Sequence, residues 1–249
     1  MSAGSAALLA GLRKEMAAVA DPKKAPAMQA YMKSSMPYHG VTLPQVTSIC
    51  KRVFASSPIG CKAWRTAVLE IWRGAKFREE RYAAVSLLSA KPYAECLTLD
   101  MMPVLEEMIV TGAWWDHVDG LSQVVGTLLR AHPKEMRPLM RAWSTDPNMW
   151  KRRVSIICQL RFKRDTDLRL LYANIEANTS DREFFIRKAI GWALRQYAWT
   201  DPQEVSRYVR EHEAELSGLS RREALKNIDS SLSPPRARER KAAGASRRA

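Results

Sequence analysis

Aromatic side chains recur along this chain at intervals of about 35 residues. The positions are Phe77, Trp115, Trp150 and Phe185, with spacings of 38, 35 and 35 residues. The segments DPNMWKRRVSIICQL and DREFFIRKAIGWAL align on this phase, with Arg153 opposite Lys188. Two helices per period without strands are typical of HEAT- or armadillo-like α-solenoids. We therefore predict an all-α fold, a HEAT-like α-solenoid of about six antiparallel helix pairs with a basic concave face. Because the units resemble one another only weakly, a plain helical bundle stays open.

Proline punctuates the helical pattern, and the sequence has no hairpin turns or alternating apolar runs that would indicate strands. Breaks are expected at Asp21-Pro22, Ser57-Pro58, Lys91-Pro92, His132-Pro133, Asp146-Pro147 and Asp201-Pro202. Several of these place proline in the first turn of the next helix, where it is well tolerated. We expect about twelve helices joined by short loops.

Basic residues dominate the charge of the chain. Of the net charge of +14, the segment Pro235–Ala249 carries +5, from six basic residues and one acid, so the rest carries +9. We predict one repeat domain over residues 1–229 and a disordered basic tail over 230–249, since prolines, small residues and arginines cannot bury a core. A basic body with a basic tail indicates a polyanionic partner. A basic protein without such a partner is the alternative.

Cysteine and histidine spacing indicates no metal site. Cys50, Cys61, Cys96 and Cys158 form neither a metal-ligand pattern nor a disulfide framework, so free thiols in a reducing cytosol are expected. The sequence shows no secretory signal peptide and no apolar run long enough to span a membrane. We predict a cytoplasmic protein that needs no metal or other cofactor.

The stretch GAWWDHVDG (112–120) opens a helix predicted over 114–131. Trp114 shares a stripe with the apolar positions of this helix, which predicts core packing for it; the other positions are Val118, Leu121, Val125 and Leu128. Trp115 and Asp119 are an i,i+4 pair on a flank outside this stripe. Asp116 is expected to point further round, away from Trp115. The Trp115–Asp119 pair lies either at the edge of a helix–helix contact or in a surface cleft.

A second aromatic lies among cations in REFFIRKAIGWALRQYA (182–198). The predicted core stripe consists of Ile186, Ile190, Ala193 and Tyr197. Trp192 lies off this stripe, in the company of Lys188 and Arg195. A tryptophan so placed suits contact with a nucleic-acid sugar or backbone, with the two cations binding DNA. Packing against the neighbouring repeat is the alternative.

The chain resembles the AlkD-type DNA alkylation-repair glycosylases from about residue 10 to residue 228. The resemblance is carried by MQAYMKSSMPYHGV (28–41), TGAWWDHVDG (111–120), DPNMWKRRVSIICQLRFK (146–163) and DREFFIRKAIGWALRQYAWTDP (181–202). It implies HEAT-like helix pairs. It also implies excision of N3- and N7-alkylated purines from duplex DNA, with the lesion left in the duplex. The basic tail has no counterpart in the family.

The resemblance also implies a role for five residues. Asp119 would be the catalytic carboxylate, Trp115 and Trp192 would contact the sugar, Arg153 would lie near the lesion backbone, and Tyr31 would be a further cleft residue. An alkylated purine already carries positive charge, so it can leave without a general acid, and the oxocarbenium-like sugar favours a carboxylate and aromatic faces. We expect a monomer whose partner is alkylated double-stranded DNA in the nucleoid.

Two further functions stay open from the sequence. One is a non-catalytic DNA- or RNA-binding solenoid, which would need the cations but no placed carboxylate. The other is a HEAT-type protein-interaction scaffold, which would not need a strongly basic body. The sequence also leaves open whether a small methyl group or a bulky adduct is the preferred lesion, and whether the role is general repair or self-protection.

Overall fold

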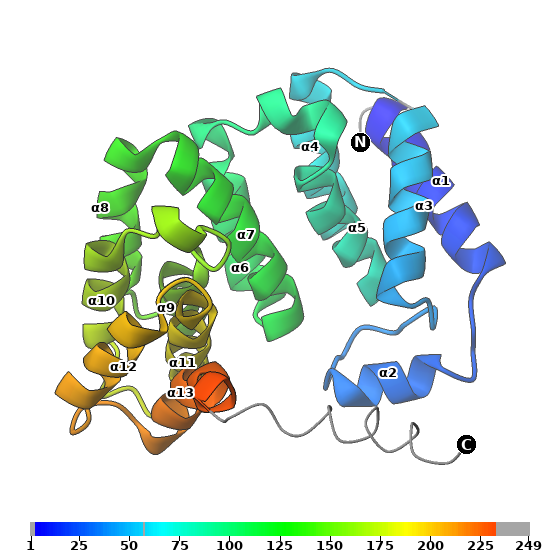
Figure 1. Ribbon diagram of the computed structural model, residues 1–249. Coiled ribbons are helices and arrows are strands. Elements are labelled where there is room, and N and C mark those ends of the chain that lie inside the picture. Colours follow the sequence, from blue (N-terminus) through cyan, green and yellow to red (C-terminus); the bar gives the residue numbers. More distant parts are fainter. Residues whose placement is uncertain (1–2, 57, 233–249) are drawn as a thin grey trace, which may run out of the picture. The chain divides into compact units, whose positions relative to one another are not determined.

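Helices make up all the regular secondary structure of residues 3–56 and 58–232, the part of the chain that this computed structural model describes (Figure 1). Thirteen α-helices and three short 3₁₀ helices are present there, and there is no strand. The predicted all-α, solenoid-like class is confirmed. Each predicted proline break lies between helices or in the first turn of one, as expected from the fixed φ angle of proline.

The helices form two compact units. The first, up to Cys158, contains α1 (Ala3–Ala18), α2 (Ala25–Tyr31), α3 (Leu43–Ser56), α4 (Cys61–Arg73), α5 (Arg78–Leu88), η1 (Lys91–Cys96), η2 (Leu99–Met101), α6 (Met102–Gly112), α7 (Trp115–Ala131), α8 (Pro133–Trp143) and α9 (Met149–Ile157). The second, from Gln159, contains η3 (Lys163–Asp165), α10 (Leu168–Glu176), α11 (Phe184–Ala198), α12 (Pro202–Glu211) and α13 (Gly218–Leu232). The predicted boundary at residue 229 falls within α13, and the rest of the predicted tail, residues 233–249, lies outside the described residues.

The recurring aromatics mark the starts of alternate helices. Phe77 is the N-cap of α5, Trp115 is the first residue of α7, and Trp150 and Phe185 are the second residues of α9 and α11. Arg153 and Lys188 each follow the N-cap of their helix by five residues, so they occupy equivalent positions. The sequence period therefore corresponds to one pair of helices.

Polar side chains fix where several of these helices begin. The Asn148 side chain accepts hydrogen bonds from the backbone N–H groups of Trp150 and Lys151, and so starts α9. Asp167 and Asp201 cap α10 and α12 in the same way. Such caps satisfy backbone donors that have no partner inside the helix.

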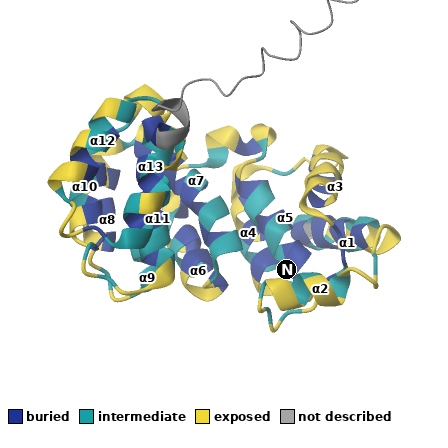
Figure 2. Cartoon of the chain, turned by 60° about the horizontal axis from the view of Figure 1, so that its bottom comes forward, coloured by how far each residue is buried: buried dark blue, intermediate teal, exposed yellow. Residues whose placement is uncertain are grey.

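Large apolar side chains fill the core of the first unit. Trp64, Ile71 and Leu87 are fully buried, because α4 and α5 pack against each other and against α1 and α3. Leu105 is fully buried on α6, which packs against α7 and α9. Helix α2 differs, since none of its residues is buried, and in Figure 2 it carries only the colours of intermediate and exposed residues.

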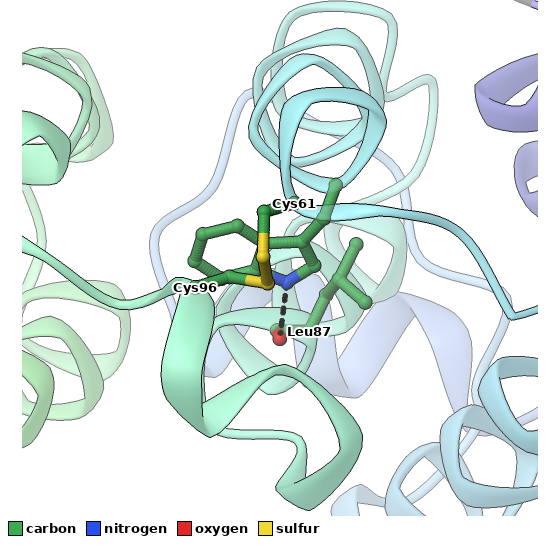
Figure 3. The surroundings of a disulfide bond; sticks show 4 residues. Cys61, Leu87 and Cys96 are labelled. Carbon is green, nitrogen blue, oxygen red and sulfur yellow. Dashed lines mark hydrogen bonds between the residues drawn. A yellow bond between two sulfur atoms is a disulfide. The ribbon is translucent and has the colours of Figure 1, made fainter.

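The prediction of free thiols is wrong for two of the four cysteines. Cys61, the first residue of α4, forms a disulfide with Cys96 at the end of η1, and their Cα atoms are 5.1 Å apart. Figure 3 shows this bond close to the Leu87 carbonyl, which accepts a hydrogen bond from the indole N–H of Trp64. Cys50 and Cys158 are free and buried. Sequence spacing could not reveal the pair, because only the packing of η1 on α4 brings the two residues together.

Reduction of this disulfide should destabilise the first unit. The bond closes a loop between positions 35 residues apart, and in the chain-entropy model such a cross-link is worth about 4 kcal/mol. We expect denaturant unfolding in the presence of a thiol reductant to show a lower free energy of unfolding by up to this amount. The double variant Cys61→Ala/Cys96→Ala is the control and should not respond to reductant. A wild-type protein that is equally unresponsive would contradict the prediction.

Candidate functional site

Helix α7 begins at Trp115, directly after a residue in the extended conformation. Trp114 is the N-cap, with φ −154° and ψ 150°, and its ring lies 6.3 Å from that of Trp150 in α9. The predicted packing role of Trp114 agrees with this contact, although the residue precedes the helix. The predicted core stripe of α7 is buried as expected, at Val118, Leu121, Val125 and Leu128. Trp115 is half-buried and begins the helix.

Asp119 forms a two-point ion pair with Arg153 of α9. The Nε and Nη2 atoms of Arg153 donate to the two carboxylate oxygens of Asp119, at 2.8 and 2.9 Å. The Arg153 side chain is 4% exposed and that of Asp119 is 19% exposed. A planar guanidinium that donates to both carboxylate oxygens fixes the orientation of the carboxylate. The structure thus brings together two of the residues that the sequence analysis selected.

The Asp119 carboxylate keeps acceptor capacity beyond this pair. Among the described residues, Arg153 provides the only donors to it. A carboxylate has about four acceptor positions, so those not used by Arg153 can take a water molecule. Burial raises the pKa of Asp119 above the ordinary aspartate value, and the bond and charge of Arg153 offset this only in part. A more basic, partly solvated carboxylate is suited to orienting a water molecule.

Asp116 lies on a different flank of α7 from Asp119, and it is buried there although it is outside the predicted core stripe. Its side chain is only 6% exposed, and it accepts bonds from Arg78 Nε at 2.8 Å and Arg78 Nη2 at 2.7 Å. The Tyr82 hydroxyl, at 2.6 Å, and the backbone N–H of His117, at 2.8 Å, also donate to it. Burial alone would raise the pKa of Asp116, but the bonds from Arg78 and Tyr82 outweigh burial and lower it. With four donors around it, Asp116 has no acceptor position left for a reacting molecule.

Asp116 is buried outside the core stripe because α7 is covered on more than one side. Besides its partner α6, it packs against α5 and α9. Asp116 faces α5, where Arg78 lies, and Asp119 faces α9, where Arg153 lies. A helical wheel with a single core face treats both flanks as solvent-exposed, whereas a helix in the middle of a layer has neighbours on both flanks.

The Asp116 pair belongs to a buried network that the sequence analysis missed. Tyr82 shares a hydrogen bond of 2.9 Å with Tyr38, and Arg78 Nη1 donates to the Ser34 hydroxyl at 3.2 Å. The carboxylate of Glu79 accepts from three successive backbone N–H groups, those of His39, Gly40 and Val41. The start of α5 therefore holds both α7 and the loop over residues 34–41. The sequence signal for this network is FREERY (77–82), which places several charged residues in the first turn of a helix. Charged side chains that become buried there need partners of opposite charge or hydrogen bonds.

His117 is buried in the same region and is neutral. Its ring packs edge-on against Trp72 with centroids 5.1 Å apart. Burial lowers the pKa of His117 to about 4. Since its side chain is fully buried, His117 contributes packing here and is not available to a substrate.

Tyr31 lies at the end of α2, next to the loop that the α5 network holds. Its side chain is 74% exposed, the most exposed large apolar or aromatic residue among the described ones. The structure records no contact between Tyr31 and Asp119, so the two remain separate elements of the predicted site.

In the second unit, Trp192 is half-buried on α11, off a core stripe that includes Ile186, Ile190 and Ala193. Tyr197, predicted in that stripe, is only half-buried. Lys188 Nζ lies 2.7 Å from a carboxylate oxygen of Glu223 in α13, and Arg195 Nη1 donates to the other oxygen. Both predicted DNA-binding cations thus share an acidic partner that the sequence analysis did not consider.

Neither a metal-binding cluster nor a membrane-spanning helix occurs in the described part of the chain. No cluster of three or more His, Cys, Asp or Glu side chains there could hold a metal ion. Within residues 3–56 and 58–232, no helix is long and apolar enough to cross a membrane.

Comparison with known proteins relates the chain to one family and to a solved structure. A family model described as "DNA alkylation repair enzyme" matches residues 12–228. Among solved structures, the chain is similar to a "Predicted DNA alkylation repair enzyme from Enterococcus faecalis", with 30% sequence identity and a TM-score of 0.75. That match covers 84% of this chain and 96% of the other. No curated protein matches.

Proposed function

This chain belongs to the DNA alkylation repair enzyme family, and on that premise we propose that it is a monofunctional DNA glycosylase. The bond cleaved would be the N-glycosidic bond of cationic N3- or N7-alkylated purines in duplex DNA. The substrate class comes from the resemblance of its motifs to AlkD-type glycosylases. The observation that carries the proposal is the Asp119 carboxylate, which Arg153 fixes at two points and which keeps acceptor positions for water.

In the proposed mechanism the alkylated base leaves first and the sugar develops positive charge. The leaving base is already cationic, so no side chain has to protonate it. Asp119 stabilises the oxocarbenium-like sugar and orients the water that attacks it. Arg153 acts through Asp119 by fixing its orientation. Trp115, one turn before Asp119 on α7, would present an aromatic face to the sugar.

The second unit would supply DNA contacts of its own. Trp192 is proposed to contact a sugar, and Lys188 and Arg195 to bind backbone phosphate. Tyr31, exposed on α2, is proposed as a further contact in the first unit. Because none of these groups requires an extrahelical base, no base-flipping pocket is needed for the reaction.

A non-catalytic DNA- or RNA-binding protein remains the alternative. Binding alone would need cations, but it gives no reason for a carboxylate held by Arg153 with acceptor positions to spare.

Incubation with alkylated DNA tests the proposal. We expect purified protein to release 7-methylguanine or 3-methyladenine from methylated duplex DNA, measured by mass spectrometry of the free bases. Abasic sites should appear in equal amount without strand cleavage, since no lyase step is proposed. Unmethylated duplex is the control. Binding of methylated duplex without any base release would favour the non-catalytic alternative.

A further inference from the structure

One carboxylate holds both cations that flank Trp192. Glu223 of α13 receives Lys188 on one oxygen, at 2.7 Å, and Arg195 Nη1 on the other. The Glu223 side chain is 12% exposed, so the two bonds form in a largely buried position. Glu223 is thus the common point of two ion pairs on the second unit.

The three residues of α11 involved lie on one stripe of the helix. Lys188, Trp192 and Arg195 are spaced by four and then three residues, which places them above one another on a single face. Lys188 lies one turn before Trp192 and Arg195 one turn after it. Because Glu223 bonds to both cations, it fixes the positions of the two positive charges on either side of the Trp192 indole.

The close packing of α13 on α11 fixes where Glu223 stands. A Cβ atom built on Gly191, the residue before Trp192, would lie 2.5 Å from Glu223 Cβ and 2.7 Å from the Ser220 carbonyl oxygen. Only glycine allows this approach. The Ser220 hydroxyl and the Asn227 amide of α13 also donate to the carbonyls of Arg187 and Arg195, at 2.9 and 3.3 Å. Glu223 is therefore seated on a rigid contact between two helices.

The charges of this cluster do not cancel. The hydrogen bond from Lys188, together with the charges of Lys188, Arg195 and Lys226, lowers the pKa of Glu223, so it is ionised at neutral pH. Two paired cations and the nearby Lys226 leave an excess of positive charge around one carboxylate. Among the described residues, Glu223 is the only acceptor for the Arg195 guanidinium. The Nε–H and Nη2 donors of Arg195 stay available for a second anion, in the planar arrangement that suits phosphate.

We propose that Glu223 is a positioning residue, which holds Lys188 and Arg195 on either side of Trp192 so that they bind a DNA phosphodiester there. This inference rests on the proposed glycosylase function. A positioning role for Glu223 predicts the opposite effect on excision from simple competition between Glu223 and phosphate for the two cations. If Glu223 merely competed with phosphate, its neutralisation would improve both binding and excision. If it positions the cations, neutralisation should impair excision even though the net positive charge increases.

The substitution Glu223→Gln, with Glu213→Gln as its matched control, separates these effects. Glu213 lies in the same unit, is 68% exposed and, within residues 3–56 and 58–232, pairs with Arg221 alone, so both variants remove one negative charge. We expect both to bind undamaged duplex slightly more tightly than wild type at low salt. Single-turnover excision of 7-methylguanine at saturating enzyme should fall ~10-fold in Glu223→Gln only, because misplaced binding groups slow the excision of a base from DNA that is already bound.

Each outcome decides one question. Wild-type protein that excises normally while Glu223→Gln matches Glu213→Gln would overturn the positioning role and leave the glycosylase function standing. Wild-type protein that releases no base from alkylated DNA would overturn both. If Glu223→Gln does not fold, Glu223→Asp takes its place, because it keeps the charge but is one methylene shorter and cannot reach both cations. Unchanged excision by Glu223→Asp would then refute the role.

Discussion

Replacement of Asp119 by asparagine should lower base excision by about 10²-fold or more while DNA affinity changes little. An asparagine keeps the size of the side chain but lacks the negative charge that would stabilise the developing cationic sugar. Loss of one preorganised electrostatic group typically costs a factor of this size. Single-turnover excision of 7-methylguanine at saturating enzyme gives the rate, and duplex titrations give the affinity.

Asp116→Asn is the matched control for this experiment, since the two aspartates lie three residues apart on α7. All acceptor positions of Asp116 are used by donors from Arg78, Tyr82 and His117. Its replacement should therefore lower the single-turnover excision rate less than Asp119→Asn does, when both variants are measured at a temperature well below unfolding. Equal loss of excision in both folded variants would show that Asp119 has no special role.

Removal of the Asp116 charge should instead lower the stability of the first unit by about 3–5 kcal/mol. The side chains of Asp116 and Arg78 are 6% and 7% exposed, and a buried ion pair that loses one partner leaves a buried charge without compensation. Denaturant unfolding of Asp116→Asn measures the loss. The corresponding change at the exposed pair of Arg73 and Glu107, Glu107→Gln, should have a much smaller effect on stability.

A double substitution tests whether the loss comes from the charge left behind. Arg78→Met combined with Asp116→Leu replaces the pair by apolar side chains of similar size, which is often nearly neutral in stability. We expect the double variant to recover most of the stability lost in Asp116→Asn. A double variant as unstable as the sum of the two single variants would show that the two residues act independently.

Local patterns in the sequence determined the class of fold and the phase of the helices. Proline and aspartate mark the boundaries because their conformational and capping preferences act on adjacent residues, as at Asp201 and Pro202. The recurring aromatics lie at the starts of α5, α7, α9 and α11, so the predicted period of about 35 residues corresponds to one pair of helices. The apolar stripe of α7 was also correct, since burial against its partner helix follows the helical period.

Only the tertiary structure decided which polar side chains meet. The sequence placed Trp115 and Asp119 on one flank of α7, but Arg153 reaches Asp119 because α9 packs beside α7. For the same reason Asp116 pairs with Arg78 of α5, and Cys61 with Cys96. Hydrogen bonds and disulfides form over a few ångströms between residues far apart in sequence. Their partners therefore depend on how the helices pack, which the helical period does not specify.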